Sequence, residues 1–182
     1  MTRILGLSGS LRKASFNSGL LRAAVAAAPE SVTLDAHTLH GVPLYDGDAE
    51  AAEGVPPAVA VLKAALAEAD ALLLVTPEYN NGIPGVFKNA IDWMSRPPGG
   101  TSLFKGKPVA VIGASPGGFG TILAQDHWLP VLRTLGTRPW FEGRLMVSRA
   151  GGLFDSEGNL TDGDTRQRLA EFLQGFADSL QG

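Results

Sequence analysis

Residues 4–21 read ILGLSGSLRKASFNSGLL: an apolar run, then a polar loop, then the start of a helical run. The loop from Ser8 to Ser18 contains four serines, an asparagine, an arginine and a lysine. A tight turn between a strand and a helix needs only Gly or Asn, so these extra donors are expected to hold a polar ligand. The order of strand, loop and helix predicts the first βα unit of a parallel sheet.

The rest of the chain alternates short apolar runs with runs of helical periodicity. Strands are predicted at residues 3–7, 31–36, 71–75, 108–112 and 144–147. Helices are predicted at 19–28, 59–69, 86–94 and 121–135 (interrupted at Pro130). A capping signal at 161–164 precedes a last helix whose apolar face is Leu169, Phe172, Phe176 and Leu180. Long loops are expected at 46–57 and 96–101. Continuous apolar strands between helices indicate an α/β fold, a doubly wound five-stranded parallel sheet of order 2-1-3-4-5 with helices on both faces.

Composition narrows the function classes. With 182 residues, 45% of them hydrophobic, the chain is expected to form one domain over residues 1–182. A net charge of -3 gives no basic excess for nucleic acid or an anionic membrane surface, so neither is expected as a partner. No signal peptide or membrane-spanning run is evident, and a cytoplasmic location is expected. The absence of cysteine means that redox chemistry would need a bound cofactor, and His37 with His40 lacks a third metal ligand.

Three unusual loops follow predicted strands 1, 3 and 4, which are neighbours in this strand order. They are residues 8–18, 76–85 and 113–120. Ligands of open α/β sheets bind at the carboxyl ends of the strands, where the strand order reverses. The three loops are therefore expected to form one binding rim.

The first loop has the chemistry of a phosphate site. A helix N-terminus favours an anion, and serine hydroxyls with Arg12 add donors of suitable geometry. The alternative is a simple helix cap with an exposed arginine, but a single cap residue would suffice for that. Neither G-x-x-x-x-G-K-[ST] nor G-x-G-x-x-G occurs here, which argues against Walker and dinucleotide sites and leaves Asp35 as an ordinary strand residue.

The third loop matches G-x-S-x-G at residues 113–117, the pattern of a serine hydrolase elbow. Pro116 follows the serine and has no backbone N–H for an oxyanion, and the last histidine is His127, too early for a triad. The hydrolase interpretation is rejected. Gly117 and Gly118 are instead expected to let the backbone approach a flat ligand closely.

The middle loop combines shape with polarity. Tyr79 is expected to cover a ring, and Asn80 with Asn81 to pair with its polar edge. Pro77 and Pro84 stiffen the loop on either side.

Together these loops resemble the NAD(P)H-dependent FMN reductase family, the flavodoxin-like group of quinone, azo-dye and chromate reductases. Residues 9–17 match its opening G-S-x-R-x-x-S-x-N, and residues 77–93 match P-E-Y-N-x-x-I-P-G-x-x-K-N-A-I-D-W. The resemblance covers nearly the whole chain and implies a flavodoxin-like fold with bound FMN. It implies that the phosphate lies on Ser10, Arg12, Asn17 and Ser18, the ring against Pro77, Glu78, Tyr79 and Asn80, and the other side of the ring near Ser115, Gly117 and Gly118.

The resemblance also implies an enzyme that transfers hydride from NADPH or NADH through FMN to a small-molecule acceptor such as a quinone, an azo compound or a free flavin. The flavin would carry the chemistry, so no catalytic side chain and no metal are expected. Two alternatives are a flavodoxin-type one-electron carrier and an FMN reductase that supplies a monooxygenase. A homodimer or homotetramer is expected, with Trp93 or Trp128 near the contact.

Overall fold

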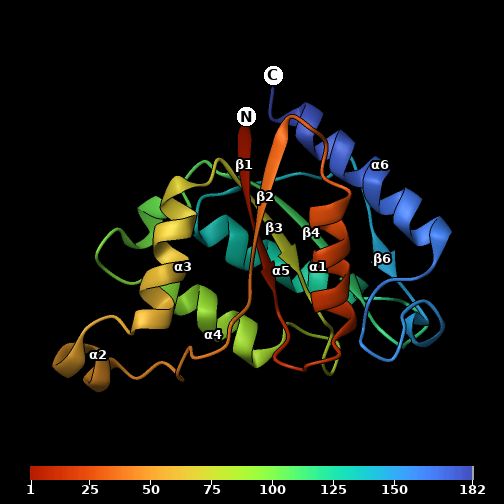
Figure 1. Ribbon diagram of the computed structural model, residues 1–182. Coiled ribbons are helices and arrows are strands. Elements are labelled where there is room, and N and C mark those ends of the chain that lie inside the picture. Colours follow the sequence, from red (N-terminus) through yellow and green to blue (C-terminus); the bar gives the residue numbers. More distant parts are fainter. Residues whose placement is uncertain (182) are drawn as a thin grey trace.

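The computed structural model describes residues 1–181, and its strands form one sheet with helices on both sides (Figure 1). The strands are β1 (Thr2–Ser8), β2 (Val32–His37), β3 (Ala71–Val75), β4 (Pro108–Ala114), β5 (Arg138–Pro139) and β6 (Met146–Val147). The helices are α1 (Phe16–Ala26), α2 (Gly47–Glu53), α3 (Pro57–Glu68), α4 (Gly85–Met94), α5 (Ile122–Thr134) and α6 (Gly163–Ser179), with 3-10 turns at Gly100–Leu103 and Ala150–Gly152.

The sheet has the predicted order, β2-β1-β3-β4-β5, and every pair is parallel. In this register Ser8 at the end of β1 lies opposite Val75 at the end of β3. Beyond β3, the N–H of Thr76 still donates to the carbonyl of Ile112 on β4. The carboxyl ends of β1, β3 and β4 therefore meet at one edge, the lower edge of Figure 1.

The fifth strand differs from the prediction. Only Met146–Val147 of the expected segment 144–147 is a strand, and a second short strand, Arg138–Pro139, also pairs with β4. The N–H groups of Arg138 and Trp140, on either side of Pro139, both donate to carbonyls of the β4 side. The chain then folds back on itself, with Gly143 against the Trp140 ring, where a Cβ would lie 2.4 Å from a ring carbon. One edge position is thus filled by two short pieces.

The apolar side chains form two cores, one on each face of the sheet. Helices α1 and α6 cover one face, where Leu20, Leu169 and Phe176 are fully buried. Helices α3, α4 and α5 cover the other, where Phe87 packs edge-on against Trp128 at 4.9 Å. This division confirms the prediction of helices on both faces.

Three helix predictions need correction. Helix α1 begins at Phe16 and not at residue 19, because the Ser15 hydroxyl accepts from two N–H groups of its first turn. The expected loop 46–57 contains α2, which Asp46 caps in the same way and which buries none of its residues. Pro130 lies inside a continuous α5 and does not interrupt it.

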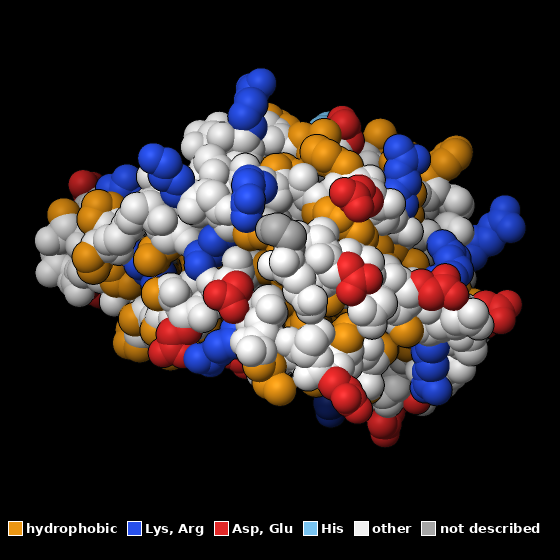
Figure 2. All heavy atoms as spheres, turned by 90° about the horizontal axis from the view of Figure 1, so that it is seen from above, with side chains coloured by type: hydrophobic (Ala, Val, Ile, Leu, Met, Phe, Trp, Pro, Cys, Tyr) orange, Lys and Arg blue, Asp and Glu red, His pale blue; other side chains and the backbone are white. Residues whose placement is uncertain are grey.

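The face of the molecule at the amino ends of the strands, opposite the rim, is seen in Figure 2. It carries lysine and arginine side chains interspersed with aspartate and glutamate. None of the helices in residues 1–181 is long and apolar enough to cross a bilayer.

Candidate functional site

A small pocket lies where the three rim loops meet. Its cavity volume is about 60 Å³. It is lined by Ser10, Arg12, Ser15, Phe16, Asn17, Pro77, Glu78, Tyr79, Ala114, Ser115 and Pro116. Residues up to 106 positions apart in the chain, Ser10 and Pro116, thus share one cavity, as the strand order predicted.

The first loop wraps the N-terminus of α1. The Ser10 side chain is buried and its hydroxyl accepts from the N–H of Arg12 at 3.3 Å. The Ser8 and Ser18 hydroxyls lie 2.8 Å apart and hydrogen-bond to each other. Arg12 is exposed, and its guanidinium has no carboxylate within 4 Å in the described chain. The loop therefore presents an uncompensated positive charge beside a helix N-terminus.

Asn17 ties this loop to the end of β4. Its amide nitrogen donates to the carbonyl of Ala114, and its amide oxygen accepts from the N–H of the same residue, both at 2.8 Å. The side chain is 3% exposed, so both bonds are sheltered from water. One Nδ2 hydrogen remains for the pocket, which Asn17 lines.

Glu78 in the middle loop bonds to α5. One carboxylate oxygen accepts from the N–H groups of Leu123 and Ala124, each at 2.9 Å. These donors are in the first turn of α5, where an anion is favoured by the helix dipole. The Glu78 carboxylate therefore caps a helix, and the residue also lines the pocket.

The tip of the middle loop is a tight turn. Tyr79 and Gly82 exchange two backbone hydrogen bonds of 3.2 and 3.0 Å. Asn80 and Asn81 between them have φ of 49° and 63°, which is the pattern of a type I′ turn. Tyr79 is 51% exposed, so its ring stands at the mouth of the pocket.

The third loop is hydrogen-bonded to β6. Ser115 donates its N–H to Val147, and its hydroxyl accepts from the N–H of Gly117 at 3.1 Å. A Cβ added to Gly118 would meet nothing within 4 Å, and its φ is not positive. Nothing inside the chain demands glycine there, which leaves the backbone open to an external ligand.

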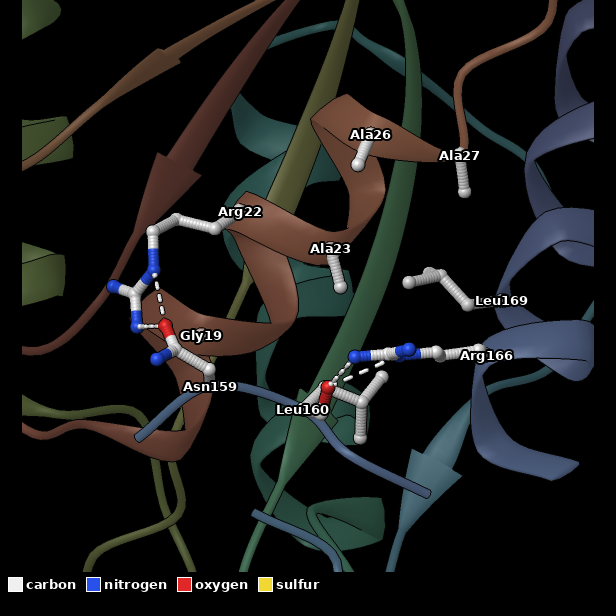
Figure 3. Close-up of a pocket in the computed structure, with 9 residues that line it drawn as sticks. All are labelled: Gly19, Arg22, Ala23, Ala26, Ala27, Asn159, Leu160, Arg166 and Leu169. Atoms are coloured by element: carbon white, nitrogen blue, oxygen red, sulfur yellow. Dashed lines mark hydrogen bonds between the residues drawn. The ribbon is translucent and has the colours of Figure 1, made fainter. Parts of the chain in front are cut away.

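A larger groove of about 440 Å³ lies elsewhere, between α1 and α6. Figure 3 shows its two arginines bonded to the loop between them, Arg22 to Asn159 and Arg166 to the carbonyl of Leu160. Arg22 also donates to the carbonyl of Gly158. Its walls are mostly alanine and leucine. The arginines hold the loop to the two helices, and the groove is not part of the rim.

Seven of the eleven residues predicted for the site line the pocket, namely Ser10, Arg12, Asn17, Pro77, Glu78, Tyr79 and Ser115. Four do not line it: Ser18, Asn80, Gly117 and Gly118. Four further residues do, and they were not among those predicted: Ser15, Phe16, Ala114 and Pro116. Ser15 stands in the opening motif and precedes the helix, a signal that could have placed it. The contact of any of them with FMN stays a prediction.

The sheet order defines a flavodoxin-like fold, with a polar pocket at the point where the strand order reverses. The family described as NADPH-dependent FMN reductase matches residues 2–152. This chain belongs to that family. The predicted family, the oxidoreductase class and the FMN and NAD(P)H cofactors are therefore confirmed.

Similar proteins agree with this assignment. An NAD(P)H-dependent FMN reductase of Pseudomonas aeruginosa is 44% identical over 172 residues, covering 94% of this chain and 91% of that protein. A 2-hydroxy-1,4-benzoquinone reductase of a Burkholderia species is 39% identical, covering 96% and 94%. The solved structure of FerB, a flavoenzyme NAD(P)H:acceptor oxidoreductase of Paracoccus denitrificans, superposes with a TM-score of 0.84 at 36% identity, covering 100% and 98%.

Proposed function

We propose that this chain passes a hydride from NADPH or NADH, through FMN held at the rim pocket, to small oxidised acceptors, with quinones first among them. The observation that carries the proposal is the convergence of three loops on one pocket beside the N-terminus of α1. Relatives named as quinone reductases support the acceptor class. Azo compounds and free flavins remain further acceptors to test.

The residues present fit a phosphate. The pocket brings together the buried Ser10 hydroxyl, the free hydrogen of Asn17 and the unpaired guanidinium of Arg12. A phosphomonoester carries about -1.5 to -2 charges near neutral pH, which this donor set would offset. A cavity of about 60 Å³ is well below the size of a pocket for a whole cofactor, so it suits only the phosphate end.

The rest of the cofactor would lie over the open rim. Tyr79, which is half exposed, lines the pocket, and the unobstructed backbone of Gly118 belongs to the third rim loop. When bound, FMN supplies the chemistry by accepting a hydride and passing two electrons on. The chain supplies the phosphate site, the rigid turn of residues 79–82 and backbone donors beside it.

The phosphate assignment is tested by Arg12→Ala. Loss of a hydrogen bond to a charged group should weaken FMN binding by about 1.5–3 kcal/mol. Riboflavin, which lacks the phosphate, should bind wild type and variant alike. Lys13→Ala is the matched control, since Lys13 is an exposed neighbour that does not line the pocket. Equal loss of both ligands would show that Arg12 acts on the fold.

The enzyme assignment is tested by mixing the FMN-loaded protein with NADPH and with NADH in the absence of oxygen. Loss of the flavin absorbance followed by its recovery on adding a benzoquinone is expected. A flavin that NAD(P)H leaves oxidised would move the chain to the electron-carrier class. The amount of FMN retained through purification then separates a resident cofactor from an exchanging one, as a supplier of a monooxygenase would require.

A homodimer is proposed, formed through an apolar face on α5. Ile122, Leu129 and Phe141 are 44%, 37% and 68% exposed and line one groove. Trp93 and Trp128, expected near the contact, are buried within the chain, so neither indole can touch a partner directly. Leu129→Glu should favour the monomer in light scattering, whereas Val61→Glu, on the exposed side of α3, should not.

We further propose that residues 1–182 form one domain. Helix α6 lies beyond the matched family segment, yet Leu169, Phe172 and Phe176 complete the core over α1. A cytoplasmic location is proposed because the reductant, NAD(P)H, is an intracellular cofactor.

A further inference from the structure

We propose that Glu78 is a positioning residue that locks the middle rim loop to α5, so that the geometry of the FMN site depends on the first turn of that helix. The inference rests on the proposed FMN site. It assigns the carboxylate of Glu78 a role through α5 and not through direct contact with the ring.

The first support is the geometry of the two hydrogen bonds. A single carboxylate oxygen of Glu78 receives the N–H groups of Leu123 and Ala124 at 2.9 Å each. Helix α5 has no side-chain cap of its own, because Thr121 at its N-cap makes no capping bond. Glu78, 45 residues earlier in the chain, therefore satisfies donors that would otherwise be left to water.

The second support is the position of the end of the loop near Gly82. Gly82, at the far end of the turn, faces α5 as well, since a Cβ there would lie 3.4 Å from Nδ1 of His127. The turn between them is closed by the paired backbone of Tyr79 and Gly82. The loop is thus hydrogen-bonded to α5 at Glu78 and lies close to it at Gly82, and the pocket-lining residues Pro77 and Tyr79 stand on either side of Glu78.

The consequence is a mechanical link between helix and cofactor. A rigid loop stabilises a bound ligand because less ordering is required on binding. Releasing Glu78 from α5 should therefore loosen FMN, although no atom of α5 lines the pocket.

The test removes the hydrogen bonds between Glu78 and α5 from each side, in the protein with FMN added. Glu78→Ala removes the acceptor, and Leu123→Pro removes one donor at a partly exposed residue in the first turn, where proline is tolerated. Leu123→Ala is the matched control, since it removes the same exposed side chain and keeps the N–H that donates to Glu78. Glu78→Gln keeps an acceptor and should rescue most of the loss.

We expect Glu78→Ala and Leu123→Pro each to raise the Kd for FMN by about three- to tenfold and to change the visible circular dichroism of the bound flavin, with the double variant no worse than Glu78→Ala alone. Leu123→Ala should match wild type. Three results would overturn the proposal: a weakened Glu78→Ala beside an unaffected Leu123→Pro, additive losses, or lower stability with unchanged flavin binding. Failure of wild type to bind FMN would instead refute the proposed function itself.

Discussion

The amide of Asn17 gives the most direct quantitative test of how the rim is built. Asn17→Ala removes two buried hydrogen bonds to Ala114 and leaves the N–H and carbonyl of that residue without partners. Each lost bond is worth about 1 kcal/mol, and each buried unsatisfied group costs about 1–3 kcal/mol. Partial access of water reduces the sum, so we expect a loss of about 2–4 kcal/mol in the free energy of unfolding.

The assay is urea denaturation of the FMN-free protein, so that any phosphate role of Asn17 does not contribute. Ser18→Ala is the matched control, because Ser18 lies on the same turn of α1 as Asn17 and, within residues 1–181, its hydroxyl bonds only to that of Ser8 at the end of β1. Its loss should lower the free energy of unfolding by about 0.5–1.5 kcal/mol. Asn17→Asp should also destabilise, since a carboxylate oxygen would face the carbonyl of Ala114. An Asn17→Ala loss no larger than that of Ser18→Ala would refute the reasoning.

Further predictions address the turn, an interior glycine and a helix cap. Asn81→Val should destabilise by about 1–2 kcal/mol because φ is 63°, while Asn81→Gly should be near neutral, as thermal unfolding would show. Gly113→Ala should cost about 1–3 kcal/mol or prevent folding, since its Cβ would lie 2.1 Å from the carbonyl oxygen of Thr76; Gly118→Ala should leave stability unchanged and weaken FMN binding. Hydrogen bonds from Thr165 hold the pKa of Asp162 below its ordinary 3.8. The stability that Asp162 contributes is therefore present above pH 3.8 and is lost as the pH falls through the lower pKa of the folded state. In denaturation measured from pH 6 to 3, Asp162→Ala should reduce the loss of stability at the acid end.

The sequence predicted the sheet well because its signals there are continuous. The runs 71–75 and 108–112 are uninterrupted apolar strands, which are found only where both faces of a sheet are covered. The strand order followed from the fold class, and it correctly predicted that loops far apart in the chain would share one pocket.

The wrong secondary-structure predictions fall where the local sequence pattern is weak or fits more than one structure. The edge strand is split because the residues after Pro139 fold back on the Trp140 ring, which no periodicity reveals. Helix α2 buries nothing, so it has no apolar stripe to be read, and only the Asp46 cap marks it. Pro130 was expected to interrupt α5, yet the helix passes through it.

The site residues were found by type, but their bonding could not be read from the sequence. Asn17 and Glu78 were predicted as ligands of phosphate and ring, and both use their side chains to tie rim loops to other elements. Partners 97 and 45 positions away leave no local signal. A polar residue in a binding loop can serve the site by fixing its backbone as well as by touching the ligand.

On the proposed site, these hydrogen bonds would let a small pocket hold one end of the cofactor. The first loop is fixed to β4 through Asn17, the middle loop to β4 through Thr76 and to α5 through Glu78, and the third loop to β6 through Ser115. Each loop is thus bonded to an element other than the two it connects, so the three cannot move apart independently. Since a pre-organised site loses little conformational entropy on binding, the proposed phosphate donors would suffice to hold FMN and would leave the remaining rim open to the nicotinamide and the acceptor in turn.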